Sequence, residues 1–219
     1  MNVSRETPPV PDAARGAFPS DRFPLAQRYA ELLATAGVER GLIGPREAPR
    51  LWERHLLNCL ALSSAVPEGA SVVDLGSGAG LPGLVLAIGR PDLSVTLVEP
   101  LLRRTTYLNE VVAELRLDNT TVVRGKAEVL HGVERFDVVT ARALAPLDRL
   151  LGWAMPLVAT DGVLLAMKGS SAADEVRAAR STLRQLGCGP AEVLELTGPE
   201  GSSTATVVRV ARAAGPRLG

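Results

Sequence analysis

The chain has 219 residues, of which 46% are hydrophobic and 3% aromatic, so one domain with a core of aliphatic side chains and alanine is expected. Lysine plus arginine and aspartate plus glutamate number 24 each, so no net charge attracts the chain to nucleic acid, and RNA contacts would need local basic clusters. Two cysteines are too few for a disulfide framework, and neither stands in a metal-binding motif. Because the sequence also shows no signal peptide and no apolar run of about 20 residues, we expect a cytoplasmic protein without a membrane span or a metal site.

The predicted organisation is one domain between two tails. Residues 1–20 are rich in proline, alanine, serine and charge, and we expect disorder there because little apolar surface is available to offset the ordering entropy. The single domain covers residues 21–212. It divides into N-terminal helices in residues 21–68 and an α/β core in residues 69–212, and residues 213–219 form a C-terminal tail.

Two helical patterns precede the core. The first helix begins near Asp21 and ends at Gly37, with an apolar stripe formed by Phe23, Leu25, Tyr29, Leu32 and Leu33. The second begins at Pro49 and runs to about Val66, with apolar residues again near one face.

From Ser71 onward, short strand patterns alternate with helical ones. The predicted strands are Ser71–Asp74, Ser94–Glu99, Thr121–Arg124, Asp137–Ala141, Gly162–Met167, Glu192–Leu196 and Thr206–Val210. The predicted helices are Leu81–Gly89, Leu101–Leu117, Leu147–Leu157 and Asp174–Leu186. This order predicts an α/β, doubly wound, mostly parallel sheet of seven strands. The last two strands have no helix of ordinary length between them, so we expect an antiparallel pair at one edge.

The motif with the most chemical information follows the first strand. It reads Asp-Leu-Gly-Ser-Gly-Ala-Gly from Asp74 to Gly80, a further glycine stands at Gly83, and a helix follows. Glycines let the backbone turn tightly and approach a ligand, and the helix behind them offers unpaired N–H groups. In an open α/β sheet, ligands bind beyond the carboxyl ends of the strands, where this loop lies. The motif therefore predicts a ligand site rather than a purely structural turn.

The glycines alone leave the cofactor open. Gly78, Gly80 and Gly83 fit the dinucleotide pattern G-x-G-x-x-G, and Glu99 follows at the end of the second strand. An NAD(P)-dependent oxidoreductase is therefore one alternative, and a non-catalytic nucleotide-binding protein is another. Asp74 favours S-adenosylmethionine, because a carboxylate here would repel a pyrophosphate and suits an ammonium and a sulfonium group. With this acid, the loop resembles that of class I methyltransferases.

Further candidates follow the neighbouring strands. Glu99 can accept hydrogen bonds from both hydroxyls of a ribose. The loop Arg124–Glu128 would border the adenine ring, with its backbone and Glu128 able to read the ring edge. Arg142 comes directly after an apolar strand, where it could hold the methionine carboxylate or an RNA phosphate. His55 on the second helix is open to a structural or a functional interpretation.

Four motifs together resemble the ribosomal RNA small-subunit methyltransferase G family, also called glucose-inhibited division protein B. They are Leu51-Trp-Glu-Arg-His-Leu-Leu-Asn-Cys-Leu60, Asp74-Leu-Gly-Ser-Gly-Ala-Gly-Leu-Pro-Gly83, Ala141-Arg-Ala-Leu144 and Met167-Lys-Gly169. The resemblance covers about residues 22 to 212. It implies a Rossmann-like class I methyltransferase fold and transfer of a methyl group from S-adenosylmethionine to N7 of a guanine in the 16S decoding-centre loop. The first 20 residues match nothing in the family pattern, and Ala79 stands where some members have proline.

The resemblance also assigns site residues. It implies cofactor contacts at Gly76, Leu81, the backbone of Ala127 and Glu128, and Arg142. Glu99 sits where the class as a whole places its ribose-binding acid, and Asp74 and Gly78 belong to the same glycine loop.

The implied reaction needs no general base, because guanine N7 carries an in-plane lone pair and no proton. Positioning should therefore dominate, and we predict no catalytic acid or base. The expected partner is 16S ribosomal RNA or the small ribosomal subunit. Arg54 and His55 are candidate substrate residues, and the arginines that could contact phosphates are Arg40, Arg46, Arg50, Arg54, Arg103 and Arg104.

Overall fold

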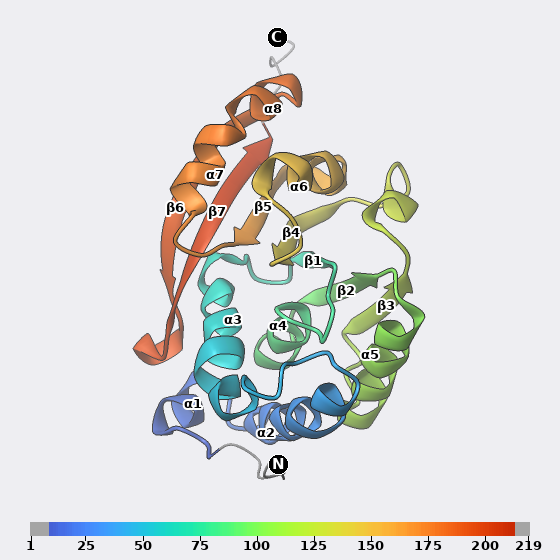
Figure 1. Cartoon of the computed structure of the whole chain (residues 1–219), viewed down its shortest axis with the longest axis vertical. Coiled ribbons are helices and arrows are strands. Elements are labelled where there is room, and N and C mark those ends of the chain that lie inside the picture. The colour runs from blue at the N-terminus through green and yellow to red at the C-terminus, as the bar shows by residue number, and fades with distance from the viewer. Residues whose placement is uncertain (1–8, 213–219) are drawn as a thin grey trace.

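The computed structural model describes residues 9–212, and its centre is a twisted seven-stranded sheet (Figure 1). The strands follow the spatial order β3-β2-β1-β4-β5-β7-β6, and β7 runs antiparallel to both of its neighbours. Their bounds are β1 Ser71–Leu75, β2 Ser94–Glu99, β3 Thr120–Arg124, β4 Phe136–Arg142, β5 Val158–Met167, β6 Cys188–Thr197 and β7 Thr204–Arg212. The predicted mostly parallel sheet, with an antiparallel pair at one edge, is confirmed.

Helices cover both faces of the sheet. Successive side chains of a strand point to opposite faces, so neighbouring residues pack against different helices. Val72 of β1 packs against the face that carries α4 (Gly83–Gly89) and α5 (Leu102–Leu115). Val73 packs against the other face, whose helices are α6 (Leu147–Ala154), α7 (Ala172–Ala178) and α8 (Arg180–Gln185). Figure 1 shows the two groups of helices on either side of the sheet. The central strands β1 and β4 are therefore largely buried on both faces, whereas β3 and β6 at the edges are partly exposed.

The N-terminal helices form an additional layer over α4 and α5. The first consists of α2 (Phe23–Leu32), which continues into a π-helical turn at Leu33–Gly37. The second winds irregularly from residue 48 to residue 65, with a π-helical stretch at Leu51–Leu57 and a short α-helical turn, α3 (Asn58–Leu60). Both predicted helices are therefore present. The π-helical stretch turns His55 inward together with the apolar residues Leu51, Trp52, Leu56 and Leu57.

The structure corrects the expected disorder within residues 1–20. Helix α1 (Asp12–Ala17) is ordered, and its Ala14 and the following Phe18 are buried. A six-residue helix has little stability of its own, so tertiary packing must hold it. Here α1 packs against the turn Pro199–Gly201 between β6 and β7, a partner that is invisible to a local reading of composition. The rest of the predicted tail, residues 1–8, and the tail 213–219 lie outside the described residues.

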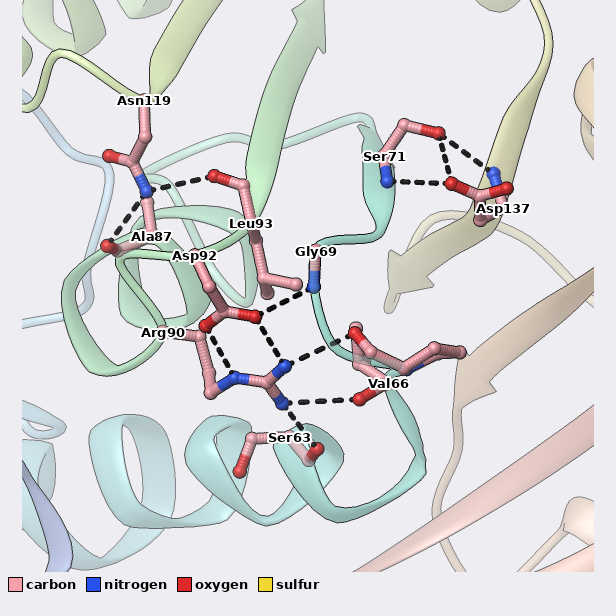
Figure 2. Close-up of polar contacts among 11 residues, drawn as sticks. Ser63, Val66, Gly69, Ser71, Ala87, Arg90, Asp92, Leu93, Asn119 and Asp137 are labelled. Carbon is pink, nitrogen blue, oxygen red and sulfur yellow. Dashed lines mark hydrogen bonds and ion pairs between the residues drawn. The ribbon is translucent and has the colours of Figure 1, made fainter.

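The amino-terminal edge of the sheet is closed by polar contacts (Figure 2). Arg90 follows α4 and pairs with Asp92 through two 2.7 Å contacts, and Asp92 also accepts the backbone N–H of Gly69 at 2.9 Å. The same guanidinium donates to the carbonyls of the segment that enters β1, namely Ser63, Val66 and Pro67. At the start of the sheet, the Asp137 carboxylate of β4 accepts from the N–H and hydroxyl of Ser71. The contacts of Arg90 fix the carboxyl-terminal end of the second helix at the edge of the sheet opposite the glycine loop.

Candidate active site

The glycine loop begins where β1 ends. Gly76, Gly78 and Gly80 have φ angles of +68°, +58° and +100°, in the left-handed region that favours glycine. The backbone N–H groups of Gly76 and Ser77 donate to the carbonyl of Val98 in β2, at 2.8 and 3.1 Å. A Cβ at Gly76 would lie 2.5 Å from Cδ1 of Leu144. The positive φ therefore favours glycine at position 76, whereas the terminal methyl of the exposed Leu144 side chain could move away from a Cβ.

Asp74 lies beneath this loop rather than on its surface. Its side chain is fully buried, and Oδ2 accepts the backbone N–H of Gly83 at 3.0 Å. Oδ1 is also buried and has no hydrogen-bond partner within residues 9–212. Burial raises the pKa of Asp74 to about 7. The sequence places this acid beside the ligand, whereas the structure gives it a direct role in holding the start of α4 against the loop.

Glu99 ends β2 as predicted, and it is 1% exposed. Its Oε2 accepts the backbone N–H of Gly78 at 3.0 Å, and Oε1 accepts that of Leu101 at 3.0 Å. Arg104 lies 3.4 Å from the same carboxylate. Glu99 is thus adjacent to the glycine loop and shapes it.

Three neighbouring pockets form a cleft along the carboxyl ends of the strands. The inner pocket, about 300 Å³, is lined by Leu75, Gly76, Val98, Pro100, Gly125, Lys126, Ala127, Glu128, Leu144 and Trp153. The middle pocket, about 260 Å³, is lined by Leu42, Ile43, His55, Gly76, Ser77, Gly78, Ala79, Leu81, Arg104, Arg142 and Ala143. The outer pocket, about 840 Å³, is lined by Glu53, Arg54, Asn58, Arg142, Ala143, Leu144, Ala145, Pro146, Met167, Lys168, Gly169, Glu175, Ser203 and Thr204.

Shared residues join these pockets. Gly76 borders the inner and middle pockets, and Arg142 borders the middle and outer ones. Leu144 stands between the inner and outer pockets, in a loop where Ala143 has a φ of +52°. Six of the candidate residues line the cleft, namely Gly76, Gly78, Leu81, Ala127, Glu128 and Arg142. Asp74 and Glu99 do not, and they lie directly behind its wall.

Arg142 joins the N-terminal layer to the carboxyl end of β4. Its Nη2 donates to Nδ1 of His55 at 2.7 Å and to the carbonyl of Arg54 at 3.2 Å. Its Nη1 lies 3.3 Å from Sγ of Cys59. His55 in turn contacts Oε2 of Glu47 through Nε2 at 3.0 Å. The structure therefore brings together the three predicted residues Arg54, His55 and Arg142.

Two groups of residues at the site had no role assigned from the sequence, although Lys168 belongs to the motif Met167-Lys-Gly169. Glu47 lies in the connection between the first two helices and carries no local signal of its role. Lys168 donates to the carbonyl of Ala145 and to Glu175, both at 2.7 Å, and Glu175 also accepts the N–H of Leu147 at 2.9 Å. This network braces the loop after β4. Its signal was available, because Lys168 directly follows β5 at the edge of the sheet where the other candidates gather.

The candidate RNA-contacting arginines fall into two groups. Ion pairs join Arg40 to Glu110, Arg54 to Glu47 and Arg104 to Glu99. By contrast, Arg46, Arg50 and Arg103 are exposed and form no ion pair within residues 9–212.

In the part of the chain that the structure describes, no cluster of three or more His, Cys, Asp or Glu side chains could hold a metal ion. None of the helices described there has the length and apolar character needed to span a bilayer.

The sheet order and the glycine loop at the end of β1 define a class I methyltransferase fold. The same fold is seen in a ribosomal protein L11 methylase from Lactobacillus delbrueckii subsp. bulgaricus, with a TM-score of 0.53 and 15% identity over 72% of this chain and 77% of that one. A dinucleotide-binding oxidoreductase would instead have the strand order 3-2-1-4-5-6. The antiparallel β7 between β5 and β6 departs from that order.

The chain belongs to the rRNA small subunit methyltransferase G family, whose pattern matches residues 22–202. A ribosomal RNA small subunit methyltransferase G from Nocardioides sp. is 66% identical over 95% of this chain and 84% of the relative. One from Thermobifida fusca is 59% identical over 91% of this chain and 84% of the relative. The family resemblance seen in the sequence is confirmed, and the oxidoreductase and non-catalytic alternatives are set aside.

Proposed function

We propose that this protein uses S-adenosylmethionine to methylate N7 of a guanine in 16S ribosomal RNA, acting on the RNA or on the small ribosomal subunit in the cytoplasm. The observation that carries the proposal is the family match over residues 22–202, whose relatives are named as small-subunit ribosomal RNA methyltransferases. The three-part cleft supports it, because an inner pocket and a middle pocket meet at Gly76 and open into a larger pocket at Arg142.

The residues present fit this cofactor. Within residues 9–212, Oδ1 of Asp74 is a buried acceptor without a donor behind the glycine loop, and a carboxyl with a pKa of about 7 is partly ionised at neutral pH, which suits a cationic ligand and not a pyrophosphate. The inner pocket offers apolar walls and the backbone of Ala127 and Glu128 for an adenine ring. Glu99 lies directly behind the wall of the cleft, and each of its carboxylate oxygens keeps a lone pair beyond the hydrogen bond from Gly78 or Leu101, so we assign it to the ribose hydroxyls. We assign Arg142 to the methionine carboxylate. S-adenosylmethionine, when bound, supplies a methyl group activated by a sulfonium.

The chain's own contribution is orientation. Guanine N7 has no proton to lose, so we assign no side chain as a general base. The outer pocket places Arg54, Asn58 and Lys168 around a space large enough for a nucleotide, and these donors suit a base edge or a phosphate. Exposed Arg46, Arg50 and Arg103 are our candidates for contacts with the neighbouring RNA backbone.

Mapping of N7-methylguanine in 16S RNA tests the substrate. RNA from cells that lack the gene should lose one N7-methylguanine, and purified protein with S-adenosylmethionine should restore it. An unchanged methylation map would refute the assignment to this RNA. The cofactor is tested by thermal shift, since a ligand at 100 times its Kd adds about 2.7 kcal/mol of stability. S-adenosylhomocysteine should raise the Tm and NAD should not.

A further inference from the structure

The contact between Arg142 and His55 constrains the proton on the imidazole ring. An arginine side chain has only N–H donors and stays charged, so Nδ1 of His55 must accept the 2.7 Å hydrogen bond from Arg142. Nε2 then carries the proton, and it donates to Glu47 at 3.0 Å. His55 is therefore neutral and in a single tautomer. A protonated ring would present N–H to a guanidinium, and the contact would be lost.

The surroundings make this arrangement rigid. His55 is 9% exposed, and both ring nitrogens are engaged. Its partners lie on separate parts of the chain: Glu47 is in the connection between the first helices, and Arg142 is at the carboxyl end of β4, 87 residues further along. No nitrogen of the ring remains for a substrate. The proposed substrate contact of His55 is therefore better explained by a contact with Arg142.

We propose that His55 is a positioning residue that holds the Arg142 guanidinium in the cleft, with Glu47 fixing the tautomer that allows it to do so. This inference rests on the proposed function, because Arg142 borders the middle and outer pockets where cofactor and RNA would meet. Arginine side chains are flexible, so an acceptor at 2.7 Å reduces the number of orientations that a ligand must select.

The arrangement makes ligand binding sensitive to acid. Burial and Arg142 lower the pKa of His55, against an opposing effect of Glu47, and Arg54 on the same helix lowers it further. The neutral ring is therefore favoured at neutral pH and is lost as the pH falls through the lowered pKa. Two other groups lie near Arg142. Burial raises the pKa of Cys59 to about 11, so this thiol does not titrate in that range. Burial raises the pKa of Asp74 to about 7, so its titration must be separated from that of His55.

Nitrogen NMR of the imidazole rings tests the contact without cofactor or RNA. The sequence has two histidines, so His131→Asn assigns the signals. We expect His55 to show protonated Nε2 and unprotonated Nδ1, with a pKa below 6.5. Arg142→Ala should raise that pKa and Glu47→Gln should lower it. Glu39→Gln changes an exposed acid that does not influence the pKa of His55, and it should leave that pKa unchanged. An unprotonated Nε2, or a His55 pKa that is unchanged by Arg142→Ala, would overturn the proposal.

A pair of amide variants tests the consequence for binding. In His55→Asn the side-chain oxygen can occupy the place of Nδ1 and still accept from Arg142. In His55→Gln the amide reaches the place of Nε2 and leaves Arg142 without its acceptor. We expect S-adenosylhomocysteine affinity or methyl transfer to fall about 10- to 100-fold in the glutamine variant, and much less in the asparagine variant. Equal losses in two folded variants would show that His55 is merely structural.

The pH dependence of S-adenosylhomocysteine affinity is a further test. Affinity in the wild type should fall on acidification, and the share of that fall caused by protonation of His55 should be absent in His55→Asn. This share should remain in the control His131→Asn, because Nε2 of His131 contacts the Trp153 carbonyl and not Arg142. The same fall in affinity on acidification in wild type and His55→Asn would assign the titration to another group and contradict the role of His55. Failure of the wild type to bind S-adenosylhomocysteine at any pH would instead overturn the proposed function and leave the NMR result intact.

Discussion

The hydroxyl of Tyr29 donates a 2.8 Å hydrogen bond to the carbonyl oxygen of Ala79 in the glycine loop. Tyr29 belongs to α2 and is fully buried. A Cβ at Gly80 would lie 3.0 Å from the same hydroxyl, so the phenol packs closely on the loop. The N-terminal layer thus supports the glycine loop on the side away from the sheet.

Tyr29→Phe removes only this hydroxyl and leaves a buried carbonyl without its donor. We expect the free energy of unfolding to fall by about 1 kcal/mol, and S-adenosylhomocysteine affinity to fall with it. Denaturant titration and calorimetry measure the two effects. Tyr107→Phe is the matched control, because the buried Tyr107 hydroxyl has no partner within residues 9–212 and its removal should not destabilise the protein. Equal losses in both variants would mean that the Tyr29 hydrogen bond does not support the loop.

The parts of the fold that were predicted are those with a local pattern. The strands that end at or beside Asp74, Glu99 and Arg142 could be recognised because buried parallel strands are short, continuous apolar runs. Because parallel strands end at the same edge of the sheet, their last residues could be placed together there. A break at Ala179 within the predicted last long helix could not be seen, because its residues remain helical in composition and only the packing separates α7 from α8.

The parts of the site that were missed depend on contacts between distant segments. Glu47, His55 and Arg142 meet only after the second helix has packed against the end of β4. Asp74 shows a different limit, because the motif gives its position but not the direction of its side chain. The side chain points under the loop because the N–H of Gly83 at the start of α4 offers it a hydrogen bond there.

Glu99→Gln tests the ribose assignment. The variant keeps the shape but loses the charge that accepts from Gly78 and, when ligand is bound, from the ribose. We expect S-adenosylhomocysteine affinity to fall about 10- to 100-fold by calorimetric titration. Adenosine and 2′,3′-dideoxyadenosine separate the two roles. If Glu99 binds the ribose, the preference for adenosine should collapse in the variant. Parallel weakening of both ligands would restrict Glu99 to holding the loop.

Asp92 should contribute to acid stability at the opposite edge of the sheet. Its hydrogen bonds with Arg90 lower its pKa below the usual range for aspartate. A lowered folded-state pKa means that the contribution is present above about pH 4, the unfolded value, and is lost as the pH falls through the folded value. The pair is partly exposed, so we expect about 1 kcal/mol or less, or at most about 2–4 °C in Tm.

Asp92→Asn should therefore lower the Tm at pH 7 and make the acid limb of the Tm curve shallower. Asp118→Asn changes an exposed aspartate that forms no ion pair within the described residues, and it should leave both features unchanged. Scanning calorimetry between pH 3 and 7 measures the Tm and its dependence on pH. As the pH falls, the Tm curves of wild type and Asp92→Asn should begin to converge at about pH 4. Parallel curves for wild type and Asp92→Asn would contradict the linkage.

Arg142→Ala decides which ligand the guanidinium holds. If it binds the methionine carboxylate, S-adenosylhomocysteine affinity should fall about 10- to 100-fold, because a charged group loses its partner. If it binds an RNA phosphate, cofactor affinity should hardly change, RNA affinity should fall, and the slope of log affinity against log salt should flatten by about one. Arg142 borders both the middle and the outer pocket, so the structure allows either contact, and we expect the first because the guanidinium lies beside the glycine loop in the middle pocket. Arg180→Ala, an exposed arginine on α8 away from the cleft, controls for the loss of one positive charge. Normal cofactor binding with a flattened salt slope would move Arg142 to the RNA side, and unchanged binding of both ligands in a folded variant would remove it from the site.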